Sequence, residues 1–102
     1  MSWNRVAESS ELEAGKVIVV EIGETRLAVC RTNNGIYAID DLCTHDGGPL
    51  DQGELIGEQI ECPRHGARFD VTSGKALTLP AVRPVKTYPV REQDGKIEVE
   101  LS

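Results

Sequence analysis

The sequence predicts a single all-β domain of antiparallel strands, either a β sandwich or a small barrel. Three observations favour this class: short runs rich in β-branched residues, turn-forming sequences between them, and the lack of any long amphipathic helical pattern. A chain of 102 residues has room for one modest core, and 39% hydrophobic and 27% charged residues are ordinary proportions for a folded protein. We therefore expect residues 1–102 to form one domain.

The expected strands follow one another in hairpins. Residues 23–25 predict a tight turn between the first two strands, and Asn33-Asn34-Gly35 predicts a second hairpin. Near the C-terminus, Asp94-Gly95 separates two runs that alternate with period two. A short helical turn is expected around residues 9–13. The expected strands span residues 17–22, 26–30, 36–39, 85–90 and 97–101.

The middle of the chain, from about Asp41 to Leu79, differs from these flanking strands. It is rich in Gly, Pro, Asp and Thr. A loop-rich insert of this length in a small β domain needs a source of order other than a core. A bound metal would supply that order, because the free energy of metal binding becomes free energy of folding. We expect a small inserted subdomain at about 41–79 that holds a metal centre.

Charge and cysteine content limit the partners and the compartment. The net charge of −6 disfavours nucleic acid and anionic membranes as partners and suits docking against a basic protein. No apolar run approaches the roughly 20 residues that a membrane span needs. Three cysteines without a visible export signal are typical of reduced thiols, so the cytoplasm is the expected compartment. Cys30, in a strand pattern, is expected to be an inert core residue.

Two short clusters, Cys43-Thr44-His45 and Cys62-Pro63-Arg64-His65, contain both histidines and two of the three cysteines. Together they offer two sulfur and two nitrogen ligands, which is a complete set for a metal site. Structural zinc sites usually draw their ligand pairs at spacings of two to four residues. The mixed Cys/His pairs, with one and then two residues between the ligands, favour a two-iron, two-sulfide cluster, although a zinc site stays open as an alternative.

This pattern resembles the signature of the Rieske [2Fe–2S] proteins. The resemblance implies an all-β domain with one [2Fe–2S] cluster at the tip of an inserted subdomain. By the same resemblance, Cys43 and Cys62 would bind the inner iron, His45 and His65 would bind the outer iron, and the segment around Pro80 would cover the cluster. Further residues that resemble the family are Gly47-Gly48-Pro49-Leu50, Gly53, Phe69-Asp70, Gly74 and Leu79-Pro80-Ala81.

The expected chemistry is one-electron transfer at a low potential for this family. Two ferric ions, two sulfides and two thiolates give a neutral oxidised site, which is easier to reduce than an all-cysteine cluster. Rieske subunits of quinol-oxidising complexes resemble this chain but add a disulfide between the loops, where Gly48 and Arg64 stand here. They also carry two hydroxyl donors to sulfur at the positions of Ala67 and Phe69. Without those donors, we expect a potential towards the bottom of the roughly −150 to +300 mV range of such centres.

The chain is most similar in these features to the ferredoxin component of bacterial multicomponent oxygenases, especially aromatic-ring dioxygenases. That resemblance implies a carrier, not an enzyme, that takes electrons from a flavin reductase to a terminal oxygenase. Both partners would dock transiently near His45 and His65, and Asp46 and Arg64 are hypothesised to face them. No catalytic residues are expected, because the sequence shows no nucleophile–base set.

Three other functions stay open from the sequence. A small Rieske subunit of a nitrite-reductase-like enzyme resembles the same domain. A structural zinc-binding module for protein interaction would use the same four ligands. A redox or iron sensor would use the same cluster, although no DNA-binding or effector element in the sequence supports it.

Overall fold

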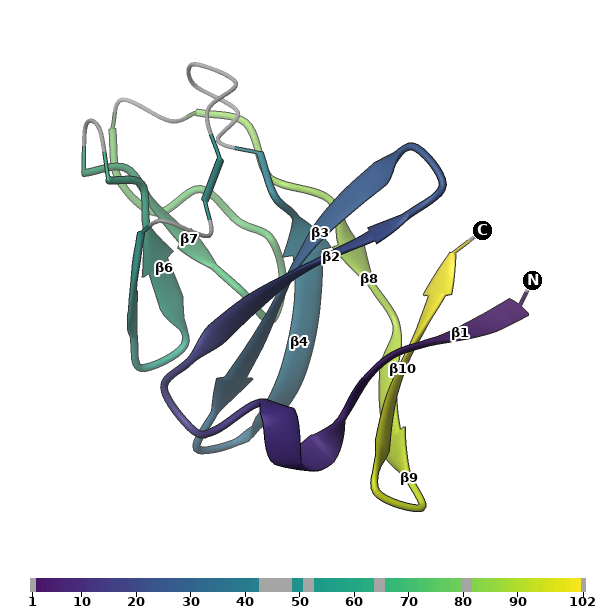
Figure 1. Ribbon diagram of the computed structural model, residues 1–102. Coiled ribbons are helices and arrows are strands. Elements are labelled where there is room, and N and C mark those ends of the chain that lie inside the picture. Colours follow the sequence, from purple (N-terminus) through teal and green to yellow (C-terminus); the bar gives the residue numbers. More distant parts are fainter. Residues whose placement is uncertain (1, 43–48, 51–52, 64–65, 80–81, 102) are drawn as a thin grey trace.

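The computed structural model describes residues 2–42, 49–50, 53–63, 66–79 and 82–101, which form three small antiparallel sheets (Figure 1). Within these ranges the 3₁₀ turn η1 is the only helical element, and no helix could span a membrane. The predicted all-β class is confirmed. The elements in chain order are β1 (Ser2–Glu8), η1 (Ser9–Glu11), β2 (Val17–Ile22), β3 (Thr25–Thr32), β4 (Gly35–Asp40), β5 (Glu54–Ile56), β6 (Gln59–Glu61), β7 (Arg68–Asp70), β8 (Thr87–Tyr88), β9 (Val90–Gln93) and β10 (Lys96–Leu101).

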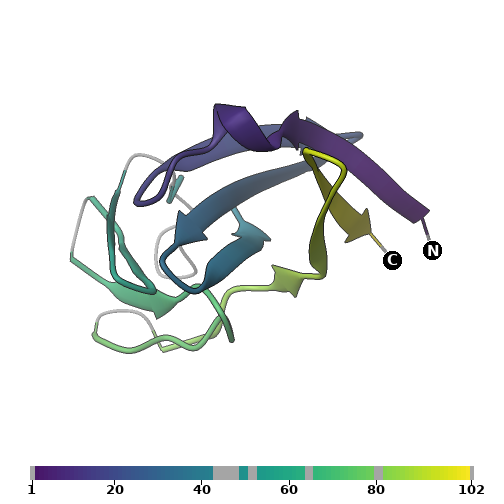
Figure 2. The ribbon, with the colours of Figure 1, turned by 90° about the horizontal axis from the view of Figure 1, so that it is seen from below.

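The three sheets are named here by their strand orders. Sheet A has the order β1-β10-β9, sheet B has the order β2-β3-β4-β8, and sheet C has the order β5-β6-β7. All neighbouring strands are antiparallel. The two ends of the described chain lie side by side because Ser2 pairs with Leu101, and sheet C lies at the far side of sheet B from them (Figures 1 and 2).

Strand β3 separates two hydrophobic cores. Its residues from Leu27 to Cys30 are fully buried, and successive side chains of a strand point to opposite faces. The framework core, between sheets A and B, consists of Leu12, Leu27, Val29, Ala38, Ile97 and Val99. The insert core, on the other face of sheet B, consists of Ala28, Cys30, Ile39, Leu50, Ile60, Cys62, Ala67, Phe69, Val71 and Val85.

The hairpins predicted from the sequence are largely confirmed, with one correction. The run at 85–90 was expected to be one strand, but it forms two short strands on either side of Pro89. Proline has no backbone N–H to donate and cannot continue a ladder on that side. Strand β8 pairs with β4 in sheet B, whereas β9 pairs with β10 in sheet A. The chain therefore passes from one sheet to the other at Pro89.

The middle of the chain is more ordered than the sequence indicates. The segment expected to be loop-rich contains β5, β6 and β7, and six of its residues are buried in the insert core: Leu50, Ile60, Cys62, Ala67, Phe69 and Val71. The expectation that this segment lacks a core was wrong, because strands of three residues are too short to show a period-two pattern. Strand β1 was missed as well. The bounds of the insert at about 41–79 stay a prediction, and sheet C lies inside them.

Gly53 allows the close approach of the strands in sheet C. A Cβ atom placed on Gly53 would lie 1.8 Å from the carbonyl oxygen of Glu61, so an alanine there would force β5 and β6 apart. A Cβ on Gly57, in the turn of the same hairpin, would meet nothing within 4 Å, although φ is +61°.

We expect Gly53→Ala to lower the urea midpoint of unfolding far more than Gly57→Ala. The second change costs only the roughly 1–2 kcal/mol of a left-handed residue, whereas the first creates a backbone clash. Urea titrations followed by circular dichroism would compare the two variants with the wild type. Equal midpoints for the two variants would contradict the close packing at Gly53.

Candidate metal centre

The four predicted ligands are not equally described by the structure. Cys62 is described, whereas Cys43, His45 and His65 lie outside the described residues. The hypothesised partner-facing residues Asp46 and Arg64 also lie outside them. The ligand set as a whole therefore stays a prediction, and the site is built below from Cys62 and from the residues on either side of each loop.

Cys62 lies at the end of the β6–β7 hairpin. The register pairs Glu61 with Arg68, so Cys62 is the first residue beyond the ladder on that strand. Its N–H donates to the carbonyl oxygen of Ala67 at 2.6 Å, and its own carbonyl oxygen accepts the N–H of Gly66 at 3.0 Å. These two bonds make a tight loop, which fixes where the Cys62 side chain lies relative to sheet C.

The Cys62 side chain lies in the insert core. It is fully buried and forms no disulfide. The core around it also includes Ala67, which is opposite it in the loop, and Phe69 on β7. Neither of these side chains carries a hydroxyl that could donate to sulfur. Cys62 shares its burial with Cys30 but begins a loop, whereas Cys30 lies within a strand, and this loop position fits a soft ligand on the inner side of an iron–sulfur cluster.

Hydrogen bonds attach residues 77–78 to the same hairpin loop. The N–H of Leu77 donates to the carbonyl oxygen of Arg68 at 2.7 Å, and the Thr78 hydroxyl oxygen accepts the N–H of Arg68 at 2.9 Å. The Thr78 hydroxyl also donates to the carbonyl oxygen of Gly66 at 3.3 Å. The next residue, Leu79, is therefore held beside the loop that follows Cys62. Pro80, expected to cover the cluster, lies outside the described residues.

Cys30 is a core residue, as the sequence predicts. Burial and, to a smaller extent, the nearby Asp41 carboxylate raise the pKa of its thiol to about 12. A thiol with this pKa stays protonated at neutral pH and is a poor metal ligand. In the described part of the chain, no group of three His, Cys, Asp or Glu side chains is arranged to hold a metal ion.

Asp41 is the residue that the sequence analysis missed. Only Leu42 separates it from the first ligand cluster, yet its carboxylate is fully buried. Buried carboxylates are rare and need partners. The only signal in the sequence is its position between a strand and a ligand motif, which does not distinguish it from a solvated acidic residue.

Comparison with known proteins agrees with the predicted family. Residues 2–89 match the Rieske [2Fe-2S] domain family. The chain is 38% identical to the ferredoxin component of the naphthalene 1,2-dioxygenase system of Pseudomonas putida, and the match covers 100% of this chain and 98% of that protein.

Solved structures show the same fold. The ferredoxin of carbazole 1,9a-dioxygenase from Nocardioides aromaticivorans IC177 superimposes with a TM-score of 0.92 at 36% identity, over 97% of each chain. A chain in a complex of reduced oxygenase and oxidised ferredoxin of carbazole 1,9a-dioxygenase superimposes with a TM-score of 0.90 at 35% identity, over 95% of this chain and 91% of that one.

These matches decide between the alternatives that the sequence left open. A family match over most of the chain identifies a [2Fe–2S] protein and not a zinc module, and the full-length relatives are ferredoxins of dioxygenase systems. The chain belongs to the Rieske [2Fe–2S] family, as a ferredoxin of the kind found in aromatic-ring dioxygenase systems, and it holds one cluster with Cys and His ligands to transfer electrons.

Proposed function

We propose that this protein carries single electrons from a flavin-containing reductase to a terminal, aromatic-ring-hydroxylating oxygenase, with its cluster held by Cys43, His45, Cys62 and His65. The observation that carries this proposal is the position of Cys62, a free buried thiol at the end of a tight hairpin in the insert core. In the proposal the two thiolates bind the inner iron and the two imidazoles bind the outer, partner-facing iron. When bound, the cluster supplies reversible one-electron exchange.

The assignment of Cys62 as a ligand is tested against Cys30, the other described cysteine. Both thiols are fully buried in the same core. We expect Cys62→Ser to abolish the cluster and Cys30→Ala to retain two iron ions and two acid-labile sulfides per chain. Reduced wild-type and Cys30→Ala proteins should show an electron paramagnetic resonance spectrum with an average g below that of all-cysteine clusters.

An all-cysteine-like spectrum of the wild type would exclude the two histidine ligands. Zinc bound in place of iron, or equal loss of iron in both cysteine variants, would refute the assignment as a whole.

The surroundings of Cys62 support a low reduction potential. Hydrogen bonds to the sulfurs stabilise the reduced, more negative cluster and raise the potential. Ala67 and Phe69 are fully buried beside Cys62 and carry no hydroxyl group. We therefore propose a midpoint potential below zero, in the lower part of the range of Rieske centres.

Ala67→Ser should raise the midpoint potential. One hydrogen bond to a charged group contributes about 1.5 kcal/mol, which corresponds to roughly 60 mV for a one-electron couple. Ala38→Ser is the matched control, because Ala38 is equally buried but lies in the framework core. Protein-film voltammetry of both variants would measure the shifts. Identical potentials for Ala67→Ser and the wild type would contradict the role assigned to this position.

Three exposed apolar side chains, close in sequence to the two ligand clusters or to Pro80, are proposed to form one docking surface. The exposed fractions are 78% for Leu79, 76% for Val82 and 43% for Leu42. Leu79 adjoins the residues that are hydrogen-bonded to Gly66 and Arg68, and Leu42 directly precedes Cys43. Large exposed apolar side chains of this kind are typical of contact sites for another protein. We propose that the oxygenase contacts this surface while the imidazoles of His45 and His65 lie closest to it.

The double variant Leu79→Ser and Val82→Ser should slow reduction of a dioxygenase terminal oxygenase about tenfold, since each lost contact costs on the order of 1 kcal/mol. Ile56→Ser is the control, because Ile56 is also an exposed aliphatic residue but lies in β5 next to the turn that points away from Cys62. Stopped-flow mixing of reduced ferredoxin with oxidised oxygenase would measure the rates at matched iron content. If Ile56→Ser slowed the reaction as much as the double variant, the result would contradict a local docking surface.

The proposed electron donor is a flavin-containing reductase. A one-electron carrier needs a partner that divides the two electrons of a hydride donor, which is what a flavin does. The proposed compartment is the cytoplasm, where thiols such as Cys30 and Cys62 stay reduced. The net charge of −6 supports protein partners with basic surfaces, and neither nucleic acid nor a membrane surface is part of the proposal.

A further inference from the structure

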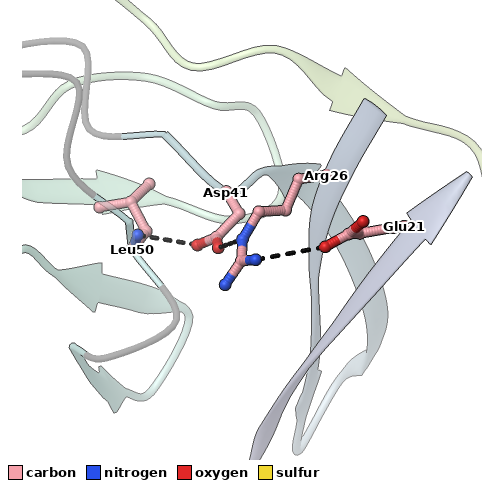
Figure 3. A network of polar contacts seen from close by, with 4 residues as sticks. All are labelled: Glu21, Arg26, Asp41 and Leu50. Carbon is pink, nitrogen blue, oxygen red and sulfur yellow. Dashed lines mark hydrogen bonds and ion pairs between the residues drawn. The ribbon is translucent and has the colours of Figure 1, made fainter. Parts of the chain in front are cut away.

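One carboxylate joins the two ends of the segment that contains the first ligand cluster. Asp41 directly precedes Leu42 and Cys43, and Leu50 follows the Gly47-Gly48-Pro49 stretch. The N–H of Leu50 donates to Asp41 Oδ1 at 2.8 Å (Figure 3). The chain therefore leaves Asp41 and returns to the same carboxyl group nine residues later.

The other oxygen of this carboxylate is attached to the framework. Asp41 Oδ2 accepts a hydrogen bond from Arg26 Nε at 2.7 Å, and the Asp41 N–H donates to the carbonyl oxygen of Arg26 at 3.0 Å. Arg26 belongs to β3, and its Nη1 is 3.4 Å from Glu21 on β2 (Figure 3). The closing contact at Leu50 is thus fixed to two strands of sheet B.

Leu50 links the same contact to the second ligand loop. Its side chain is fully buried in the insert core, which also contains Cys62. Its carbonyl oxygen accepts the N–H of Gly53 at 2.9 Å, and Gly53 packs against the backbone of Glu61, the residue before Cys62. Asp41 is therefore connected through Leu50 and Gly53 to the backbone of the residue before Cys62, so it links the start of the first loop to the start of the second.

The burial of Asp41 favours a role in holding the loop in place, in addition to any contribution to stability. The Asp41 side chain is 0% exposed, whereas that of Arg26 is 48% exposed. Removing a carboxylate from water costs free energy that a well-packed apolar side chain would not cost. A carboxylate, however, has two acceptor oxygens, so one group can bind the loop backbone and the framework guanidinium at the same time.

We propose that Asp41 is a positioning residue for the iron–sulfur cluster: by bonding Leu50 and Arg26 together it sets the position of the first ligand loop against the loop of Cys62. This inference rests on the proposed ligands Cys43 and His45. Without the carboxylate, both ends of that segment lose their common attachment, and the bound cluster is exposed to water and to chelators.

The test measures release of iron to a ferrous chelator from reduced, folded protein well below its unfolding temperature. We expect Asp41→Ala to release iron at least tenfold faster than the wild type. Asp41→Asn should be intermediate, because its amide oxygen still accepts from Leu50 while its NH₂ group cannot accept from Arg26. Arg26→Gln should also be intermediate, since it retains the bond between Asp41 and Leu50.

Glu98→Ala is the matched control. Glu98 accepts a hydrogen bond from Arg91 Nε at 2.6 Å, so this variant also removes a carboxylate from an arginine pair, but in sheet A. It should release iron at the wild-type rate. A purely structural role for Asp41 would instead lower the unfolding temperature without changing the rate of iron release from the folded protein or the width of the electron paramagnetic resonance lines.

Wild-type release rates and line widths in folded Asp41→Ala would overturn the inference and leave the proposed function intact. If Asp41→Ala does not fold, Asp41→Asn and Arg26→Gln carry the same comparison, and wild-type rates in both would overturn it. A wild-type protein without a histidine-ligated cluster would overturn the proposed function, and the positioning role with it. Hydrogen–deuterium exchange of the peptide that contains Leu50 should be faster in the Asp41 variants than in Glu98→Ala.

Discussion

The burial of strand β3 on both faces is the constraint on which the other parts of the structure depend. Four consecutive residues, Leu27 to Cys30, have no contact with water, so each face of this strand must be covered by a different layer. Sheet A covers one face through the framework core, and sheet C covers the other through the insert core. A chain of 102 residues thereby builds two cores around one shared strand pair, β3 and β4, and needs no long helix to cover its sheet.

In this arrangement the proposed metal centre is adjacent to the insert core. Cys62 is itself a member of the insert core, and the first ligand segment begins directly after β4, the partner of β3. Arg26 on β3 and Asp41 at the end of β4 lie at the same end of this strand pair, because Leu27 pairs with Asp40. The first loop therefore follows the buried Asp41 and the second begins at the buried Cys62, where close packing allows little displacement.

The sequence predicts the parts of this structure that have local signals. Residues 17–22 are mostly β-branched and Asn33–Gly35 is a hairpin sequence, and both features depend on neighbours in sequence. The ligand pattern is similarly local, and so the family could be identified. The break at Pro89 between two sheets and the role of Asp41 could not be predicted, because each depends on partners in other strands of the sheet. The strands of sheet C pair with near neighbours in sequence, but three residues are too few to show a period-two pattern. No local sequence pattern predicts that Leu50 and Arg26 are the hydrogen-bond partners of Asp41.

The apolar character of the insert core has two consequences for an electron carrier. Reduction adds negative charge at the cluster, and Ala67 and Phe69, the buried neighbours of Cys62 in this core, carry no hydroxyl to stabilise that charge, which supports the proposed low potential. The same close packing resists rearrangement around the site when its charge changes. Polar side chains there would raise the potential and would also reorient between the two oxidation states. Among the described residues, Asp41 carries the buried charge nearby, and it is already paired with Arg26 and bonded to the backbone of Leu50. Both oxygens of Asp41 are therefore engaged within the protein, and the proposed low potential and the proposed positioning of the first ligand loop both depend on buried residues of this region.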